Sequence, residues 1–235
     1  MSKLLTIIFI LTITSSFGQK VYSDTAFILR DTSGGIYHAI YIDKNLKSEY
    51  YSWWTDKSFH FHNYDSLSYA ESIKAIFGNS KPVFKREAIN SSLPKRWLEL
   101  NNYKGIFYLY SPSDYGNNSN LIITDTTIIE YFMDGPYAYV VDSCKTINEN
   151  TFEFAVRSAY RTTTKYTIHV LDWEKQIAVF DNHAQGESRY TLRVGASKAK
   201  LFPMIVNYCH DQKQIEFTFD KINFLGLLKG TIKVK

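Results

Sequence analysis

Two histidines at alternate positions, His60 and His62, form the pair of residues whose type and spacing best fit chemistry in this sequence. Alternate residues of a β-strand share a face, so both imidazoles of a strand here would point the same way and could grip one metal ion. Catalytic zinc usually takes a third protein ligand, for which the neighbours in sequence are His38, Glu49 and Asp56. Solvent-facing or packing histidines give the same pattern, so we expect no resident cofactor and keep His60 and His62 as candidate metal ligands only.

Aromatic side chains surround these histidines and are suited to stacking on a sugar or another flat ring. We expect Leu46–Trp54 to form a strand, in which the adjacent Trp53 and Trp54 face opposite sides, so both cannot enter one core layer. The alternative is that the same rings form a core beneath a helix. Trp53 and Trp54 are therefore candidate ligand-binding residues, together with His60 and His62.

Two loops carry further candidate ligand-binding residues. The polar stretch Ser111–Asn120 is long for a compact domain, and loops of this length often bind ligands. Asp134–Tyr137 is a tighter hairpin end. If both loops lie at one end of a barrel they rim its mouth, which makes Tyr115 and Tyr137 candidate ligand contacts; as mere connectors they would have no such role.

Catalytic signatures are missing from the sequence. It contains no Gly-x-Ser-x-Gly elbow, no His-Glu-x-x-His motif and no phosphate-binding glycine loop. Cys209 and His210 are adjacent, and neighbouring strand residues point to opposite faces, so they would not pair as nucleophile and base. Paired carboxylates are set in space rather than in sequence, which leaves a hydrolase of envelope polymers as a minor hypothesis.

The first nineteen residues predict export. Met1–Lys3 is a short positive start, Leu4–Ile13 is an apolar run, and Thr14–Gln19 brings small and polar residues, which is the pattern of a secretory signal peptide. The apolar run is too short to span a bilayer, and no later run is long enough, so we expect a periplasmic or extracellular protein that does not span the membrane.

The composition of the remaining 216 residues limits the partners. They hold 26 basic and 23 acidic residues without a basic block, which argues against nucleic acid. Cys144 and Cys209 are the two cysteines, and an oxidising compartment would let them form a disulfide, although two separate buried thiols fit equally well. Nothing in the sequence indicates the oligomeric state.

The fold class follows from the aromatic content and from the spacing at which apolar residues recur along the sequence. The chain has 18 Tyr, 16 Phe and 4 Trp, and beyond residue 100 short alternating runs are separated by turn residues. We expect a mainly β protein, an antiparallel meander forming a barrel or sandwich, with one or two short helices. The helices are expected at residues 66–77, ending at Gly78, and in Ser92–Leu100, after Pro94. The expected units are a hairpin-plus-helix unit at 20–92 and a barrel-like domain at 93–235, whose last strand is Gln214–Phe219.

The stretch Trp97–Tyr108 resembles the opening of a lipocalin-like (calycin) barrel, in which a Trp covers the barrel base and a glycine-containing first strand follows. The resemblance extends over about residues 92–220 and implies a cup for a small apolar ligand. We therefore expect an exported, non-enzymatic binding protein that takes such a ligand in a barrel cavity. The alternative is an envelope interaction or structural module that uses an aromatic surface on a protein or glycan.

Overall fold

The computed structural model describes residues 26–32, 37–55, 63–85, 89–113, 120–132, 135–159, 163–184, 186–209, 215–230 and 233–234. The expected signal peptide at residues 1–19 lies outside the described residues. The strands are β1 (Ala26–Asp31), β2 (His38–Asp43), β3 (Arg96–Tyr103), β4 (Ile106–Ser111), β5 (Leu121–Ile123), β6 (Thr127–Phe132), β7 (Gly135–Asn148), β8 (Thr151–Arg157), β9 (Thr163–Asp172), β10 (Ile177–Ala184), β11 (Glu187–Gly195) and β12 (Met204–Cys209). The helices are α1 (Glu49–Thr55), α2 (Asn63–Phe77), the 3₁₀-helix η3 (Ala196–Leu201) and α3 (Phe224–Leu228).

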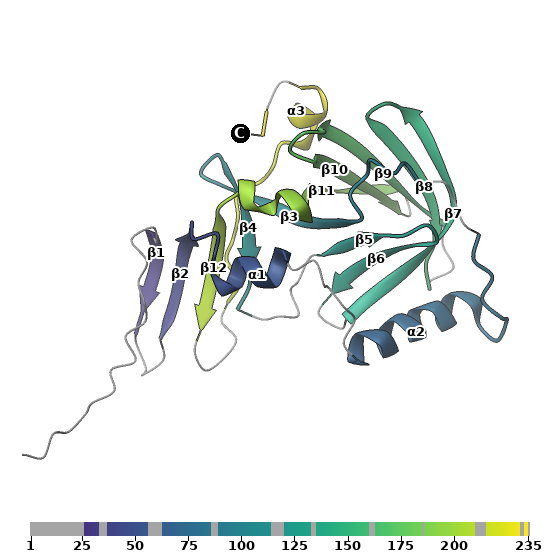
Figure 1. Cartoon of the computed structure of the whole chain (residues 1–235), viewed down its shortest axis with the longest axis horizontal. Coiled ribbons are helices and arrows are strands. Elements are labelled where there is room, and N and C mark those ends of the chain that lie inside the picture. Colours follow the sequence, from purple (N-terminus) through teal and green to yellow (C-terminus); the bar gives the residue numbers. More distant parts are fainter. Residues whose placement is uncertain are drawn as a thin grey trace, which may run out of the picture.

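Eight antiparallel strands close into a barrel (Figure 1). Strands β5 to β11 follow one another as a meander, and β3 closes the ring because its first half pairs with β5 on one side and β11 on the other. Strand β4 interrupts the meander in sequence but lies outside the ring. The expected fold class, a mainly β antiparallel barrel, is confirmed.

A second, open sheet grows from the same strand β3 (Figure 1). Beyond Leu100, the segment Asn101–Tyr103 pairs with β4, and the order continues through β12 and β2 to β1. Strand β12 runs parallel to β4 and antiparallel to β2, so the expected N-terminal hairpin is extended by a strand from the C-terminal part of the chain. The division into units at 20–92 and 93–235 stays a prediction, because strand pairing alone does not define folding units.

The longest helix, α2, packs on the outside of the barrel wall. Its Ile73 contacts Ala138 and Val140 of β7, and the backbone N–H of Ala138 donates to the Ser72 hydroxyl at 3.1 Å. Gly78 follows the helix with φ of +63°, the left-handed conformation that glycine adopts without strain. The expected helix at residues 66–77 is confirmed, and it starts at Asn63, three residues earlier than expected. No helix in the described part of the chain is long and apolar enough to cross a membrane.

Two expected elements are of the wrong type. The expected strand over Leu46–Trp54 is largely helix α1, because the Ser48 side chain accepts from the Tyr51 N–H and starts a helical turn. The expected helix over Ser92–Leu100 is wrong as well: residues 92–95 form turns and bends, and Arg96–Leu100 is the start of β3, whose backbone bonds are taken up by strands on both sides. Tertiary pairing therefore overrides the local signal of Pro94.

The expected last strand, Gln214–Phe219, is also wrong over its described part, Ile215–Phe219, which forms no strand. Side chains hold this segment instead. The Phe217 N–H donates to the Tyr110 hydroxyl at 3.0 Å, and that hydroxyl donates to the Glu216 carboxylate. The Phe217 ring packs edge-on against Tyr103. The alternation that predicted a strand thus reflects side chains that cover the open sheet.

The two faces of the barrel wall carry separate apolar clusters. Inside, the rings of Trp97, Phe152, Phe154 and Phe180 are buried against aliphatic side chains. Outside, the wall of β3, β10 and β11 is covered by β4, β12, α1, η3 and α3, and its buried residues are Leu98, Leu100, Ile177, Val179, Leu192 and Val194. Because both faces of these strands are buried, apolar residues do not mark the inside of the barrel.

No disulfide joins Cys144 and Cys209, so of the two arrangements that the sequence left open the structure has the separate thiols, each partly exposed rather than buried. Cys144 lies on barrel strand β7, opposite Phe154, and packs against the interior cluster. Cys209 ends β12 in the open sheet, opposite His38. The two thiols belong to different sheets, which the sequence separation could not reveal.

Candidate functional site

Polar side chains interrupt the apolar interior of the barrel. The inward positions of a strand alternate, and Trp97, Ile128 and Phe180 mark the inward face of β3, β6 and β10. By the same alternation, and by the strand register, inward positions in the part of the barrel that the structure describes include Glu99, Glu130, Tyr137, Tyr139, Tyr166, Asn182, Thr191 and Arg193. We call these eight residues the polar interior cluster.

Arg193 is the buried centre of this cluster. Its side chain is 5% exposed, and its guanidinium lies over the Phe180 ring with Cζ 5.6 Å from the ring centroid. Nε donates to the Thr191 hydroxyl at 3.2 Å, and Nη2 lies 3.9 Å from Oε1 of Glu130, whose side chain is 15% exposed. A cation placed over an aromatic face and beside a carboxylate is stabilised in a site that water barely reaches.

A chain of hydrogen bonds links three strands to the same carboxylate. Nδ2 of Asn182 donates to the Tyr166 hydroxyl at 2.8 Å, the Tyr166 hydroxyl bonds to that of Tyr139, and Tyr139 donates to Oε2 of Glu130 at 3.4 Å. The rings of Tyr139 and Tyr166 meet edge-to-face, with centroids 5.4 Å apart. Glu130 is thus contacted by a phenol on one oxygen and by the Arg193 guanidinium on the other.

Burial keeps the phenols of the cluster protonated. It raises the pKa of Tyr166 well above its ordinary value, and the nearby Glu130 carboxylate raises it further. Burial also raises the pKa of Tyr139, again with a contribution from Glu130. Both hydroxyls therefore remain able to donate and to accept hydrogen bonds at neutral pH.

Two interior polar atoms have no hydrogen-bond partner among the described residues. They are Nε1 of Trp97, on a fully buried side chain, and Oδ1 of Asn182. A buried donor or acceptor without a partner costs about 1–3 kcal/mol. The interior thus holds an unused donor and an unused acceptor close in the fold to the Arg193–Glu130 pair.

Glu99 adds a second carboxylate to the cluster. It lies directly opposite Arg193 in the β3–β11 register, on the same face of β3 as Trp97. Among the described residues no hydrogen bond or ion pair is found for the Glu99 side chain, whereas the Arg193 guanidinium contacts Phe180, Thr191 and Glu130.

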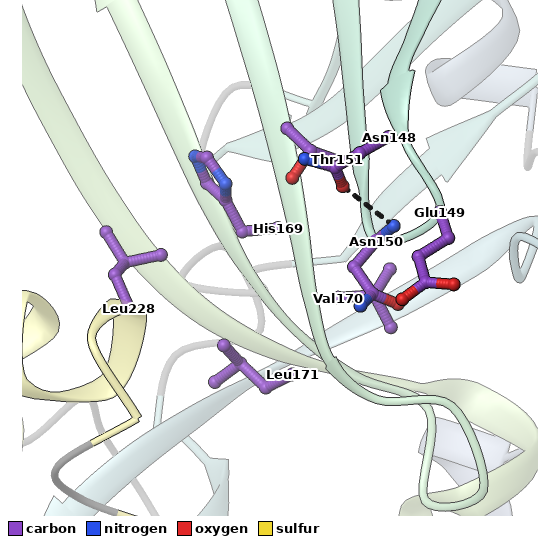
Figure 2. Close-up of a pocket in the computed structure, with 8 residues that line it drawn as sticks. All are labelled: Asn148, Glu149, Asn150, Thr151, His169, Val170, Leu171 and Leu228. Atoms are coloured by element: carbon purple, nitrogen blue, oxygen red, sulfur yellow. Dashed lines mark hydrogen bonds between the residues drawn. The ribbon is translucent and has the colours of Figure 1, made fainter.

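A separate groove of about 660 Å³ lies on the outer wall, at the end of the barrel that carries the β7–β8 turn (Figure 2). It runs from the β7–β8 turn at Asn148–Thr151 past His169 to Leu228 of α3. Its amides are committed to the turn, because Oδ1 of Asn148 accepts from the Asn150 N–H at 2.9 Å and Oδ1 of Asn150 accepts from the Trp173 indole at 2.7 Å. The side-chain oxygens of Asn148 and Asn150 are therefore already used, and Glu149, Thr151 and His169 supply the other polar side chains of the groove.

Of the residues expected to bind a ligand, the structure places Tyr137 in the interior. It lies opposite Glu130 on β7, with its ring 5.4 Å from that of Tyr139. Trp53 and Trp54 lie on helix α1 rather than on a strand, and the structure does not describe their side chains.

The remaining candidates, His60, His62 and Tyr115, lie outside the described residues. Within the described ranges, no group of three or more His, Cys, Asp or Glu side chains is placed to hold a metal ion.

Sequence reasoning missed Arg193, Glu130, Tyr139, Tyr166 and Asn182. A usable signal is present, since Glu99, Glu130 and Arg193 each stand as a single charge between apolar neighbours within a strand. Such a charge is buried whenever both strand faces are covered. Recognising it requires knowing that the outer wall is covered as well, which is a tertiary fact.

Comparison with protein-family models, with curated proteins and with solved structures finds no match for this chain.

Proposed function

We propose that this chain is an exported, non-enzymatic binding protein that holds a small molecule against the polar interior cluster of its barrel. The observation that carries the proposal is the pair of unpartnered interior atoms, Trp97 Nε1 and Asn182 Oδ1, in the same barrel interior as the buried Arg193–Glu130 pair. Buried polar atoms are normally satisfied, and a bound molecule would supply the missing partners.

The energetics of the interior support this interpretation. Replacing a buried ion pair by apolar side chains of similar volume is often neutral or stabilising. An apolar pair could therefore stand in place of Arg193 and Glu130 together without loss of stability, whereas a ligand with polar groups needs such a pair. The apolar half of the interior is filled by aromatic rings such as Phe152 and Phe154, so the proposed ligand lies at the polar half.

The proposed mouth is the barrel end formed by the turns that join β6 to β7, β8 to β9 and β10 to β11. Tyr166 and Asn182 lie near this end, as does Tyr137. Small-molecule sites commonly occur in the mouths of β-barrels, where few polar groups converge over an apolar floor.

The proposed barrel family and compartment rest on independent observations. Trp97 lies in the interior on the first barrel strand, and the meander β5 to β11 follows it, which supports a lipocalin-like barrel. The pattern of residues 1–19 supports export to the periplasm or medium.

Native mass spectrometry tests the proposed function, using the untagged protein purified from the material that its native cells secrete. We expect an adduct of defined mass that the Arg193→Met variant fails to retain and the Arg30→Met variant retains, because Arg30 is exposed on β1, outside the barrel. A bare protein mass, together with no binding of any small molecule by the refolded chain, would contradict the proposal.

The second candidate function is an envelope interaction module, which the open sheet favours. Among the described strands none pairs with the outer edge of β1, and its Phe27 and Leu29 are 40% and 44% exposed. The Phe27 ring packs at a tilt against Tyr41, and Tyr41 packs edge-on against Tyr50, giving an aromatic surface. Chemical cross-linking in intact cells, with Leu29→Lys as the disrupting variant, distinguishes this candidate: loss of a cross-linked product in that variant supports it.

A further inference from the structure

The groove on the outer wall is a hollow separate from the polar interior cluster. Thr151 of β8 lies opposite His169 of β9, and both side chains are on the outer face, because the residues next to them belong to the apolar interior. The Val170 N–H donates to the Asn150 carbonyl at 2.8 Å, which fixes the β7–β8 turn to β9. At about 660 Å³ the groove is large enough for a small organic molecule.

One wall of the groove is apolar and is held in place by helix α3. Leu171 of β9 and Leu228 of α3 both pack against the outer apolar cluster. The helix is anchored there by Leu227, which is 3% exposed, and by the Phe224 ring, which stacks on Tyr190 with ring centroids 5.6 Å apart. The wall is therefore formed before a ligand binds, which lowers the entropic cost of binding.

Three polar side chains of the groove are open to a ligand, and all three can accept hydrogen bonds. Among the described residues, no hydrogen bond or ion pair is found for the side chains of Glu149, Thr151 and His169. A carboxylate only accepts, whereas a hydroxyl and a neutral imidazole each accept as well as donate. A ligand group with several N–H donors matches this set.

The charge of the groove is negative. In the part of the chain that the structure describes, Glu149 supplies a carboxylate to its lining and no lysine or arginine lines it. Burial lowers the pKa of His169, so its imidazole is uncharged at neutral pH. The Asp181 carboxylate, two residues along β10 from the residue opposite His169, adds negative potential beside the imidazole. The groove therefore repels anions and attracts cations.

The charged and apolar parts of the groove lie at opposite ends. Figure 2 shows Glu149 on one side and Leu228 on the other, with His169 and Leu171 between them. Lys229 follows Leu228, but it is exposed and does not line the groove. A positive group therefore fits the Glu149 end, away from Lys229. An apolar body fits against the two leucines, which are only half-buried without it.

We propose that the groove binds a small primary amine with an apolar or aromatic body. The ammonium group donates to the Glu149 carboxylate and to the Thr151 hydroxyl, and the apolar body packs on Leu171 and Leu228 beside the uncharged ring of His169. This second site goes beyond the proposed interior function and does not depend on it, because no residue of the polar interior cluster lines the groove within the described ranges.

Four small molecules test the proposal by separating the charge from the apolar body. They are 2-phenylethylamine, its neutral analogue 2-phenylethanol, its anionic analogue 3-phenylpropionate, and ethylamine, which keeps the charge but lacks the ring. Each is titrated into the full ¹³C-labelled chain, and binding is followed by the imidazole C–H resonance of His169. The chain has six histidines, and a His169→Gln variant assigns the signal.

We expect 2-phenylethylamine to shift the His169 signal with a Kd about threefold or more below that of each of the other three compounds. Glu149→Gln should weaken its binding about threefold, which is the size of effect that an ion pair at an exposed carboxylate gives. Glu187→Gln is the matched control, since it makes the same change of charge at the exposed start of β11, at the other end of the barrel, and should leave the Kd unchanged.

Equal or tighter binding of the alcohol or the acid would overturn the assignment of a cation, and equal binding of ethylamine would overturn the apolar body. A His169 signal that no compound moves would overturn the site as a whole. The interior function is tested apart from this, because Arg193→Met should leave the affinity of the groove for 2-phenylethylamine unchanged. Loss of amine binding in that variant would assign the amine to the barrel interior and overturn the groove site.

Discussion

The guanidinium of Arg193 lies over the ring of Phe180, 5.6 Å from Cζ to the ring centroid, inside the barrel wall. The two residues are on neighbouring strands, β11 and β10, where Phe180 pairs with Thr191 and Arg193 with Ala178. Phe180 also packs edge-on against Trp97, so the cation rests on the aromatic floor of the interior. This contact joins the apolar half of the barrel to the polar half where we place the ligand.

Removing the buried cation should destabilise the fold moderately. Arg193→Met keeps most of the side-chain volume but leaves Glu130 without its counter-ion, so we expect the free energy of unfolding to fall by about 1–3 kcal/mol. The exposed Arg189→Met should change it by less than about 0.5 kcal/mol. Urea unfolding followed by tryptophan fluorescence measures both, and equal losses in the two variants would rule out a special role for Arg193.

The hydrogen-bond chain should respond as one unit. Tyr166→Phe removes the acceptor of Asn182 Nδ2, and Tyr139→Phe removes a longer bond to Glu130. We expect losses of about 1–3 kcal/mol for the first variant and less for the second. Because the hydroxyls share one network, the double variant should lose less than the sum, by at least about 0.5 kcal/mol. Strict additivity in a double-mutant cycle would contradict the linkage of the two phenols.

Gly195 is required by close packing at the end of β11. A Cβ there would collide with the Gln176 side chain and lie 2.9 Å from Cγ of Pro94. We expect Gly195→Ala to cost about 1–3 kcal/mol, as overpacking does. Gln176 has a φ of +54°, so Gln176→Gly removes the clash and suits the backbone, although it gives up the bond from Ser197. In thermal unfolding the double variant should recover part of the loss, and a double variant worse than the sum of its parts would refute this explanation.

His169 should make stability depend on pH. Burial lowers the pKa of its imidazole, against a smaller raising effect of the Asp181 carboxylate. The unfolded chain, with an ordinary pKa of about 6.5, binds the proton more readily, so the free energy of unfolding is highest above that pH and falls as the pH drops through 6.5. Urea unfolding at pH 7.5, 6.5 and 5.5 should show a smaller decline in His169→Gln. The exposed His183→Gln is the control, and an unchanged decline in His169→Gln would count against the burial effect.

The sequence predicts the barrel strands well because their side-chain alternation is local. Strands β4 to β12 lie in the part of the chain beyond residue 100 where alternating runs and turn residues predicted strands, and helix α2 appears where apolar residues recur at helical spacing. The failures come from non-local forces. Strand β3 looks helical around Pro94 yet is recruited to close the ring, and Ile215–Phe219 alternates yet binds through side chains.

The site was harder to predict than the fold. Tyr137 was expected from its place at a hairpin end, and it does face the interior. Arg193 and Glu130 were not expected, because a charge in a strand is usually assigned to solvent. Here helices and a second sheet cover the outer wall, so both faces of β3, β10 and β11 are buried. That covering depends on contacts between residues far apart in the chain, such as Leu227 of α3 and Leu192 of β11, which belong to one buried cluster.

A crystal structure of the chain with the compound that it retains in native mass spectrometry tests the central claim most directly. We predict density for the compound inside the barrel, within hydrogen-bond distance of Trp97 Nε1, Asn182 Oδ1 and the Arg193 guanidinium. Density confined to the outer groove beside His169 and Leu228, with the interior occupied only by the protein's own side chains, would contradict the account.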